Sequence, residues 1–341
     1  MSRLARRLAR RLAQSALVVW AVVSIAFVIN NLLPGDPARL VAGAQARPVD
    51  VGRIREQLGL DRPPLVQYAR FWRRLVHMGP RTVDPNEESA HDTCLVVFPL
   101  GRVAAHVDFG KSFQFRQPVA AVVAERLPRT FALTVAGVLV QVLFGIATGV
   151  VAAVKRGSRI DRMLVGMSLL GISAPTFLIA LLLQYLLAYR LRWLPLDGFG
   201  KTLTEHAQCL VLPALTLGVY GAAYYTRLVR DEMIVLLRQD WVRTAQAKGL
   251  PPWRVVTRHA LRNALVPVVT AIGLDFGALM GGAVVTETVF RWPGLGDLSV
   301  KATLNRDGPV LIACVVVTSI AIVASNLVVD LLCARLDPRN T

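Results

Sequence analysis

Six long stretches that are nearly free of Lys, Arg, Asp and Glu constrain this chain more than any other feature of its sequence. Each runs for 21 to 27 residues, and a single charge, Asp275, interrupts them; they are Leu12–Gly35, Thr130–Val154, Met163–Tyr189, His206–Thr226, Asn263–Thr286 and Gly308–Val329. About 20 apolar residues in a helix cross the hydrocarbon core of a bilayer. Inside lipid, a helix satisfies its own backbone hydrogen bonds. The sequence therefore predicts an all-α membrane protein with six transmembrane helices.

The composition supports a membrane protein, and the distribution of charge predicts its orientation. Hydrophobic residues make up 54% of the chain and charged residues 18%, against about 45–50% and about 25% in soluble domains. The net charge of +17 suits either nucleic-acid binding or the cytoplasmic loops of a membrane protein. With the N-terminus inside, the inner segments hold 19 Lys and Arg and the short outer loops hold six. We therefore expect both termini in the cytoplasm, basic residues against membrane lipid, and no nucleic-acid partner.

The uncharged stretches also divide the chain into segments. We expect, in order, a basic cytoplasmic N-terminus at 1–11, a first transmembrane helix at 12–35, a small extracytoplasmic module at 36–129 and a core transmembrane domain at 130–341. Within the core we expect a cytoplasmic loop at 227–262 and spans at about 130–154, 163–189, 206–226, 263–289 and 308–332. The first stretch has a basic start like that of a cleaved signal peptide. Its apolar core is longer than the usual 7–15 residues, which favours an uncleaved anchor helix.

The cytoplasmic loop has the pattern of a short helix, a break and a second helix. Asp240–Leu250 combines small and basic residues, Gly249 suits a helix C-terminus, and Pro252 suits the first turn of the next helix. An exposed helix between two spans needs a surface that buries it. The loop sequence alone leaves two alternatives open for that surface. The helix can lie as an amphipathic lid on the inner leaflet or dock onto another subunit.

The loop resembles the coupling-helix region of permease subunits in ATP-binding-cassette importers. That region carries an Ala-rich helix and a Gly, and Leu261–Pro267 is similar to the Leu, Asn-Ala and Pro pattern of its tail. Five further segments resemble the dipeptide, oligopeptide and nickel branch of this family: Asn31–Pro37, Glu125–Pro128, Gly281–Phe290, Trp292–Gly296 and Asn326–Asp330. The chain departs from that branch in a longer segment at Gly79–His106 and in Asp275, where the branch usually has an uncharged polar residue.

The resemblance implies the partners and the site residues of an importer subunit. Its coupling to an ATPase subunit is expected at Asp240, Arg243, Ala245, Ala247, Lys248, Gly249, Leu250 and Arg258. The expected partners are a homologous second permease subunit, two ATP-binding-cassette ATPase subunits that bind ATP and Mg, and an extracytoplasmic substrate-binding protein. This chain itself is expected to bind no cofactor and to lie in the bacterial plasma (inner) membrane. Peptides are the expected cargo, with nickel chelates or glutathione as alternatives.

Four residues of the fifth span differ from its apolar background. Asp275 lies near the expected bilayer centre, where a charged side chain costs about 2.5–3.5 kcal/mol or more. Because intramembrane acids usually face cavities, we expect Asp275 to line the translocation pathway and contact an amine of the cargo; a protonated, structural Asp is the alternative. Gly273, Gly277 and Gly281 recur every four residues, which predicts one face for close helix packing.

Catalytic and metal-binding patterns are missing from the sequence. Gly110-Lys111-Ser112 and Gly200-Lys201-Thr202 end like phosphate-binding loops but lack the first glycine of that motif, and the five histidines have no metal-ligand spacing. A disulfide between Cys94 and Cys209 stays an open alternative. We expect no enzymatic activity and no metal site. An ion-gradient-driven secondary transporter is the alternative from another class, although one buried acid and no internal repeat argue against it.

Overall fold

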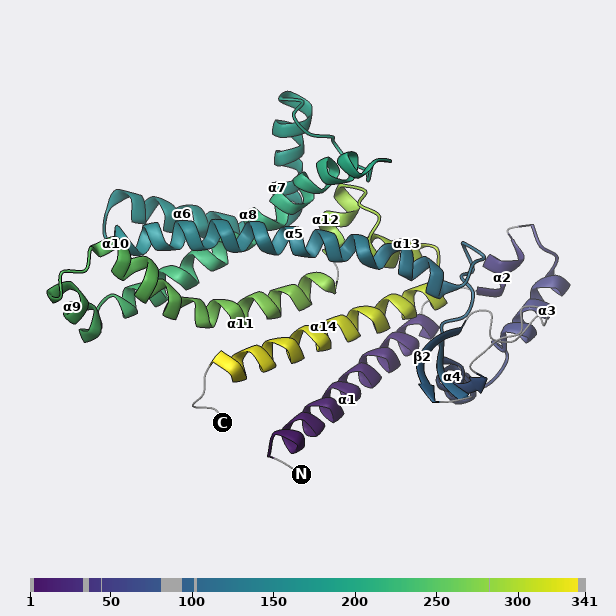
Figure 1. The fold of residues 1–341 in the computed structure, drawn as a ribbon. Coiled ribbons are helices and arrows are strands. Elements are labelled where there is room, and N and C mark those ends of the chain that lie inside the picture. The colour runs from purple at the N-terminus through teal and green to yellow at the C-terminus, as the bar shows by residue number, and fades with distance from the viewer. Residues whose placement is uncertain are drawn as a thin grey trace. The chain divides into compact units, whose positions relative to one another are not determined.

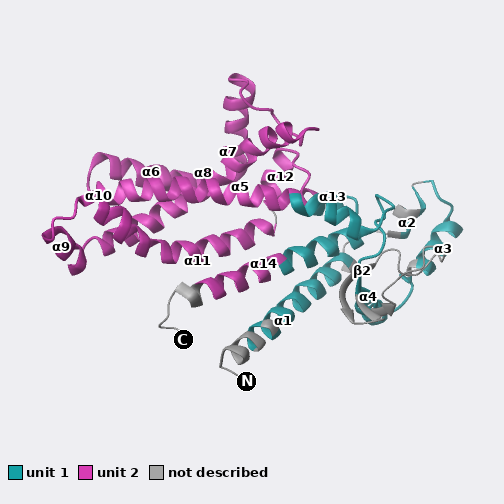
Figure 2. Ribbon diagram, in the orientation of Figure 1, with its two compact units in different colours: residues 1–128, 298–320 teal, residues 129–297, 321–341 magenta. Residues whose placement is uncertain are grey.

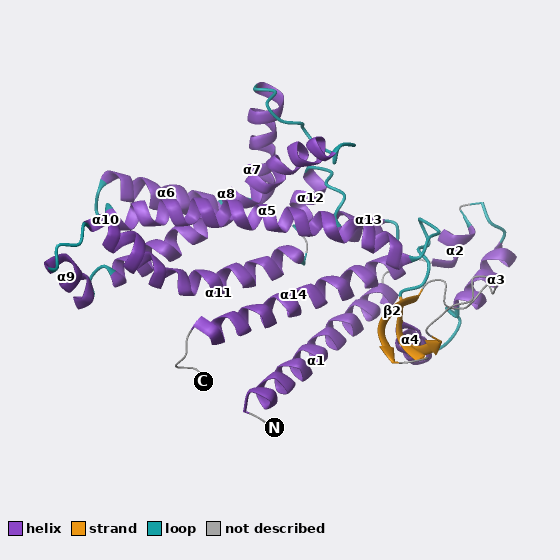
Figure 3. Ribbon diagram, viewed as in Figure 1, coloured by secondary structure: helices purple, strands orange, loops and turns teal. Residues whose placement is uncertain are grey.

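Helices make up most of the structure, and one small sheet lies beside α4 (Pro64–Leu75) (Figure 1, Figure 3). The computed structural model describes residues 3–32, 37–43, 45–80, 94–100, 103–281 and 283–336. The chain divides into two compact units (Figure 2). Unit 1 comprises residues 1–128 and 298–320, and unit 2 comprises residues 129–297 and 321–341.

The first helix of unit 1 carries the first apolar stretch. In α1 (Arg3–Leu32), the window Ala13–Asn30 is long and apolar enough to cross a membrane. Three short helices follow, and each begins at a proline, which suits a first helical turn because its missing N–H would have no partner there. They are α2 (Pro37–Ala42), α3 (Pro48–Leu58) and α4 (Pro64–Leu75).

Aromatic side chains hold these helices together. Phe27 of α1 is buried with Leu75 of α4 and with Ile312, which belongs to the part of α14 (Gly308–Leu336) inside unit 1. The ring centroids of Phe27 and Phe71 lie 5.1 Å apart. Burying a side chain of this size stabilises the fold by about 1.5–3 kcal/mol. The cluster therefore fixes one end of α1 against α4 and α14.

The all-α expectation is wrong for one segment of unit 1. Three strands form an antiparallel sheet in the order β1-β3-β2: β1 (Val76–Pro80), β2 (Cys94–Leu100) and β3 (Val103–Asp108). Val76 pairs with Val107, and Cys94 pairs with Asp108. The strands are rich in Val and contain Phe98, residue types that favour a pleated surface. The longer segment Gly79–His106 thus contributes the end of β1, all of β2 and most of β3. Its residues 81–93, 101 and 102 lie outside the described part.

Within the described residues of unit 2, the regular elements are helices joined by loops. Most of α5 belongs to it, as do the start of α13 and the end of α14. The elements are α5 (Val119–Val154), α6 (Arg159–Ser173), α7 (Thr176–Leu183), the π-helix η1 (Gln184–Arg190), α8 (Leu203–Leu236), α9 (Asp240–Ala247), α10 (Pro252–Arg254), the π-helix η2 (Val255–Ala260), α11 (Leu261–Met280), α12 (Val284–Val289) and α13 (Leu295–Leu304).

Two glycines of α5 bring it unusually close to α8. A Cβ added to Gly145 would lie 2.3 Å from the Cβ of Tyr225, and one added to Gly149 would lie 2.8 Å from the carbonyl oxygen of Thr226. Both distances are too short for real atoms, so larger residues would force the helices apart. Small residues allow this approach in transmembrane bundles, where packing rather than the hydrophobic effect joins helices.

Five described helical runs are long and apolar enough to cross a membrane: α1, α5, α8, the run Pro252–Met280, and α14. The helices α6 and α7, the latter continued by η1, pass the same test only as a pair, and the pair is bent by 107°. The bend falls at Ala174 and Pro175, because proline lacks the N–H of a helical hydrogen bond and clashes with the preceding turn. The described residues therefore contain five spans, or six when the bent pair is counted as one.

Two helix ends differ from those that the uncharged stretches predict. The sequence predicts a span over 263–289, but α11 ends at Met280 and α12 is a separate helix. The predicted loop 227–262 begins later than expected, because α8 continues to Leu236. Charge marks the apolar segments, whereas helix ends also depend on packing that a single stretch does not encode.

Candidate functional site

Asp275 of α11 lies in a polar cluster to which three helices contribute. Its Oδ2 accepts a hydrogen bond from Gln141 Nε2 of α5 at 2.5 Å and another from the Tyr225 hydroxyl of α8 at 3.2 Å. Gln141 and Tyr225 are buried, whereas Asp275 keeps part of its surface exposed. Hydrogen bonds to a carboxylate are about twice as strong as those between neutral groups. The cluster therefore links α5, α8 and α11 through one carboxylate oxygen.

Both partners of Asp275 are uncharged. No Lys or Arg forms an ion pair with this carboxylate within the described ranges, and its two hydrogen bonds come from an amide and a phenol. Such an acid can still accept a cation from outside the chain. This property is typical of intramembrane acids that face a water-filled pathway.

Sequence reasoning identified Asp275 but missed Gln141 and Tyr225. Neither residue interrupts the uncharged pattern, so charge could not reveal them. A signal was present in the glycines around them: a Cβ on Gly221 would lie 1.7 Å from Gln141 Oε1, and Gly145 packs on Tyr225. Glycines such as Gly145 and Gly221 leave room for the larger side chains of neighbouring helices. They are the signal that could have pointed to the cluster around Asp275.

Gly273, Gly277 and Gly281 all face α14 within unit 2. A Cβ on Gly273 would lie 1.6 Å from Cγ2 of Val329, so a side chain there would require Val329 to move, by rotation of its side chain or by a shift of α14. At Gly277 and Gly281, the nearest carbons of α14 would lie 3.3 Å from an added Cβ. Replacement is thus most restricted at Gly273.

The loop between α8 and α11 presents one face of α9 to solvent. Val242 is buried, and Trp241 packs on the apolar core of unit 2. The side chains of Asp240 and Arg243 are 97% and 81% exposed, and their charged atoms lie 3.8 Å apart. Ala247, Lys248 and Arg258 are also exposed, while Ala245 and Leu250 are partly so. The helix is therefore seated on its own chain by apolar residues and is polar on its other side.

Gly249 allows the chain to reverse after α9. Its φ of +78° lies in the left-handed region, which glycine adopts without the steric penalty of a Cβ. Gly249 N–H donates to the carbonyl of Gln246 at 2.9 Å, and Leu250 N–H donates to that of Ala245 at 3.2 Å. No other atom lies within 4 Å of the position of a Cβ at Gly249. A larger residue there would strain the backbone but would project into open space.

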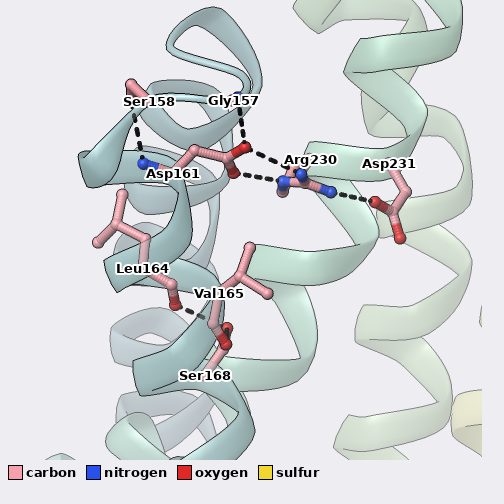
Figure 4. A network of polar contacts seen from close by, with 8 residues as sticks. All are labelled: Gly157, Ser158, Asp161, Leu164, Val165, Ser168, Arg230 and Asp231. Carbon is pink, nitrogen blue, oxygen red and sulfur yellow. Dashed lines mark hydrogen bonds and ion pairs between the residues drawn. The ribbon is translucent and has the colours of Figure 1, made fainter.

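An ion pair joins the start of α6 to α8 (Figure 4). Arg230 donates from Nε and Nη2 to the two carboxylate oxygens of Asp161 at 2.7 and 3.0 Å, and from Nη1 to Asp231 at 2.9 Å. The N–H of Gly157 also donates to Asp161, and Ser158 Oγ accepts from the Asp161 N–H as a helix cap. Paired donors of a guanidinium fix orientation as well as distance. The sequence analysis did not single out this pair, because its two residues lie 69 positions apart.

Glu287 of α12 lies in a closed polar site, although its position near the end of an apolar stretch suggests the membrane interface. The carboxylate is fully buried. It accepts from the Thr130 hydroxyl at 2.8 Å and from the N–H of Asp297 at 2.9 Å. Gly294 permits this closure, because a Cβ there would lie 2.4 Å from Glu287 Oε1. The segment after α12 therefore folds around the carboxylate of Glu287.

The remaining sequence candidates are a metal site, a disulfide and two phosphate-loop-like segments. In the described part of the chain, no group of three or more His, Cys, Asp or Glu is placed to hold a metal ion. Cys209 is a free thiol, and the side chain of Cys94 lies outside the described residues. Lys111 and Lys201 are exposed residues of loops.

Comparison with protein families assigns the chain. Residues 145–341 match the model of the binding-protein-dependent transport system inner membrane component, and residues 4–134 match the model of its N-terminal part. The chain belongs to this family. It is therefore a multi-pass inner membrane permease of the importer class, and the earlier resemblance is confirmed.

Named relatives agree with this assignment over nearly the whole chain. The glutathione transport system permease protein GsiC of Salmonella paratyphi A is 40% identical over 93% of this chain and 92% of its own length. A putative peptide transport system permease protein of Brucella abortus is 38% identical over 97% of each chain. Among solved structures, an inward-facing form of the MetNI methionine ABC transporter aligns with a TM-score of 0.55 and 18% identity, covering 64% of this permease and 98% of that chain. This last likeness concerns the fold.

Proposed function

We propose that this chain forms half of the translocation pathway of an ATP-driven importer. The bent pair of α6 and α7–η1 crosses the membrane as one span in this proposal, which makes six spans. Both termini lie in the cytoplasm, residues 36–129 form an extracytoplasmic module, and residues 130–341 form the core. The 19 Lys and Arg in the inner segments, against six in the short outer loops, support this orientation.

The observation that carries the proposal is the solvent-facing side of α9. A short helix whose apolar residues already pack on its own chain does not need lipid to bury them. Its polar side, with Asp240 and Arg243, is available to another subunit. We therefore assign coupling to the ATPase subunit to this side and to the residues that follow it, Lys248, Gly249, Leu250 and Arg258, with Ala245 and Ala247 as close-contact positions.

The energy for transport comes from other chains in this proposal. Two ATP-binding-cassette ATPase subunits bind and hydrolyse ATP with Mg, and this permease binds neither. A homologous second permease supplies the other half of the pathway, and an extracytoplasmic binding protein delivers cargo. The family description, which names binding-protein-dependent transport, supports this set of partners and favours it over an ion-driven secondary transporter.

Asp275 is proposed as a residue of the pathway. Its partly exposed carboxylate has only neutral partners, so an amino group of the cargo is a chemically suitable contact. The glycines Gly273, Gly277 and Gly281 are assigned to helix packing, since they lie against α14. Peptides are the proposed cargo, because the named relatives include peptide and glutathione permeases.

Replacing Gly249 with Leu tests the coupling role. The added side chain would project from the solvent-facing side of the loop. Loaded binding protein stimulates the ATPase, and we expect the variant to lose this stimulation about tenfold or more, equivalent to about 1.4 kcal/mol. The measurement uses the whole importer reconstituted in vesicles.

Gly157→Leu is the matched control. Gly157 has the same φ of +78° and open space around its Cβ position, so both variants carry the same backbone strain. Stimulation that survives in Gly157→Leu and is lost in Gly249→Leu supports docking at this loop. Equal stimulation in both variants would remove α9 and Gly249 from the coupling surface.

A further inference from the structure

A cavity of about 710 Å³ lies within unit 1, at the ends of two helices that can span a membrane. Phe27 and Asn30, at the end of the apolar window of α1, form one wall. Pro309 and Ile312, in the first turns of α14, form another. A cavity bounded by the ends of two spans lies at the level of a membrane surface.

The lining of this cavity is strongly basic. It includes the four arginines Arg55, Arg70, Arg74 and Arg306 and one acid, Asp108, so its formal charge is four minus one, or +3. Asp108 is already engaged by Arg74 Nε at 3.0 Å. Within the described ranges, Arg70 and Arg306 form no ion pair with a carboxylate. The cavity therefore offers guanidinium groups to an anion from outside the chain.

A buried network fixes the corner that carries Arg306. This residue has a φ of +55°, in the left-handed region. The next residue, Asp307, is 1% exposed and accepts hydrogen bonds from the Ser112 hydroxyl and from the N–H of Gln114, the latter at 3.1 Å. Asn305 Nδ2 donates to Gln114 Oε1 at 3.0 Å. The position of Arg306 is thus set by the fold.

Apolar groups share the lining with the arginines. The rings of Phe71, Phe109 and Phe113 face the cavity together with Phe27. On the same helix as Phe27, the side chains of Ile25, Val28 and Ile29 are each exposed by half or slightly more. Guanidinium groups beside an apolar surface match a ligand with a phosphate at one end and hydrocarbon at the other.

We propose that this cavity binds the headgroup of an anionic phospholipid. Arginine forms paired hydrogen bonds with phosphate, and basic residues at a membrane surface attract anionic lipids. The acyl chains would follow the exposed apolar side of α1. A lipid fits better than an acidic protein segment, because the cavity is bounded by the ends of two spans and combines its charge with aromatic walls. With the cytoplasmic termini proposed above, the cavity lies at the outer leaflet; the site itself does not depend on that orientation.

Native mass spectrometry of the full chain in its gently solubilised complex tests this site. The probes are phosphatidylglycerol and phosphatidylcholine with identical acyl chains. We expect an about tenfold preference of the wild-type protein for the anionic lipid and its loss in the double variant Arg70→Gln/Arg306→Gln. The matched control is Arg53→Gln/Arg73→Gln, which removes two exposed arginines of the same unit that do not line the cavity.

Three outcomes would overturn the proposal. One is an equal lipid preference in the two double variants. A second is binding of inorganic phosphate as tight as that of dioctanoyl phosphatidylglycerol, which would make the cavity a free-anion site. The third is an unchanged lipid preference with weaker capture of the binding protein by the Arg70→Gln/Arg306→Gln complex, which would make the cavity a protein contact. Uptake and ATPase activity are measured separately, so failure of the importer proposal would leave this result interpretable.

Discussion

Asp275 and Glu287 lie twelve residues apart in the chain, yet their surroundings are built in opposite ways. Glu287 is completely buried and is closed in by a hydroxyl and a backbone N–H, with Gly294 against it. Asp275 keeps part of its surface exposed and is held by two side chains from other helices. The first arrangement stabilises one conformation. The second can change whenever α5, α8 and α11 move relative to one another, so location in an apolar stretch does not by itself define the role of an acid.

The largest effect is expected for Glu287→Ala. The substitution leaves the Thr130 hydroxyl and the Asp297 N–H buried without their acceptor, which destabilises the fold by about 3 kcal/mol. Thermal unfolding of the detergent-solubilised protein should show a lower midpoint and yield. Glu287→Gln keeps one oxygen acceptor and should lose less. Wild-type midpoints for both variants would show that the site around Glu287 does not stabilise the fold. They would contradict the contrast between Glu287 and Asp275.

An intermediate effect, on transport alone, is expected for Asp275→Asn. Asparagine keeps an oxygen that accepts from Gln141 or Tyr225, so assembly should survive while the negative charge is lost. For a peptide with a free amino terminus, KM for uptake should rise about tenfold, equivalent to about 1.4 kcal/mol.

An amino-acetylated form of the same peptide provides the control for Asp275→Asn. Its uptake should be the same in the wild-type importer and the variant, because it has no amine for the carboxylate to contact. Wild-type kinetics with the free peptide would assign Asp275 a structural role like that of Glu287.

The smallest effect is expected for Tyr225→Phe. It removes one hydrogen bond of 3.2 Å to Asp275 and keeps the buried ring, so the loss should be about 0.5–1.5 kcal/mol. Uptake of the free peptide should fall about threefold, which corresponds to an energy within that range. Tyr224→Phe is the control, since Tyr224 is 52% exposed. Equal changes in the two variants would separate Tyr225 from the Asp275 cluster.

The apolar spans, and the acid within the fifth of them, could be found from the sequence because both depend on local composition. A stretch of about 20 residues without charge can be seen by inspecting that stretch alone. A single acid within it can be seen in the same way. The proline at 175 carried the information for the 107° bend, although not its size. The family could be inferred because its motifs are local as well.

The partners of each acid could not be predicted, because they come from distant segments. Gln141 and Asp275 are separated by 134 positions, and Thr130 and Glu287 by 157. The sheet of unit 1 was missed because its strands are short and their pairing joins separate segments of the chain. The end of α11 at Met280 was missed for the same kind of reason: the apolar stretch continues, but the chain after it folds back on Glu287.

The length of α8 has a mechanical consequence. Its 34 residues make a rod of about 51 Å at 1.5 Å per residue. Pro213, its internal proline, lies on the far side of Tyr225 from α9, so no proline joint softens the stretch between them. If the loop is pushed, as the proposed coupling requires, the displacement would therefore travel along a continuous helix from Leu236 to Tyr225. The 3.2 Å between the Tyr225 hydroxyl and the Asp275 carboxylate is already longer than the about 2.5–3.0 Å of ordinary hydroxyl hydrogen bonds, so a small displacement would be enough to detach the phenol from Asp275.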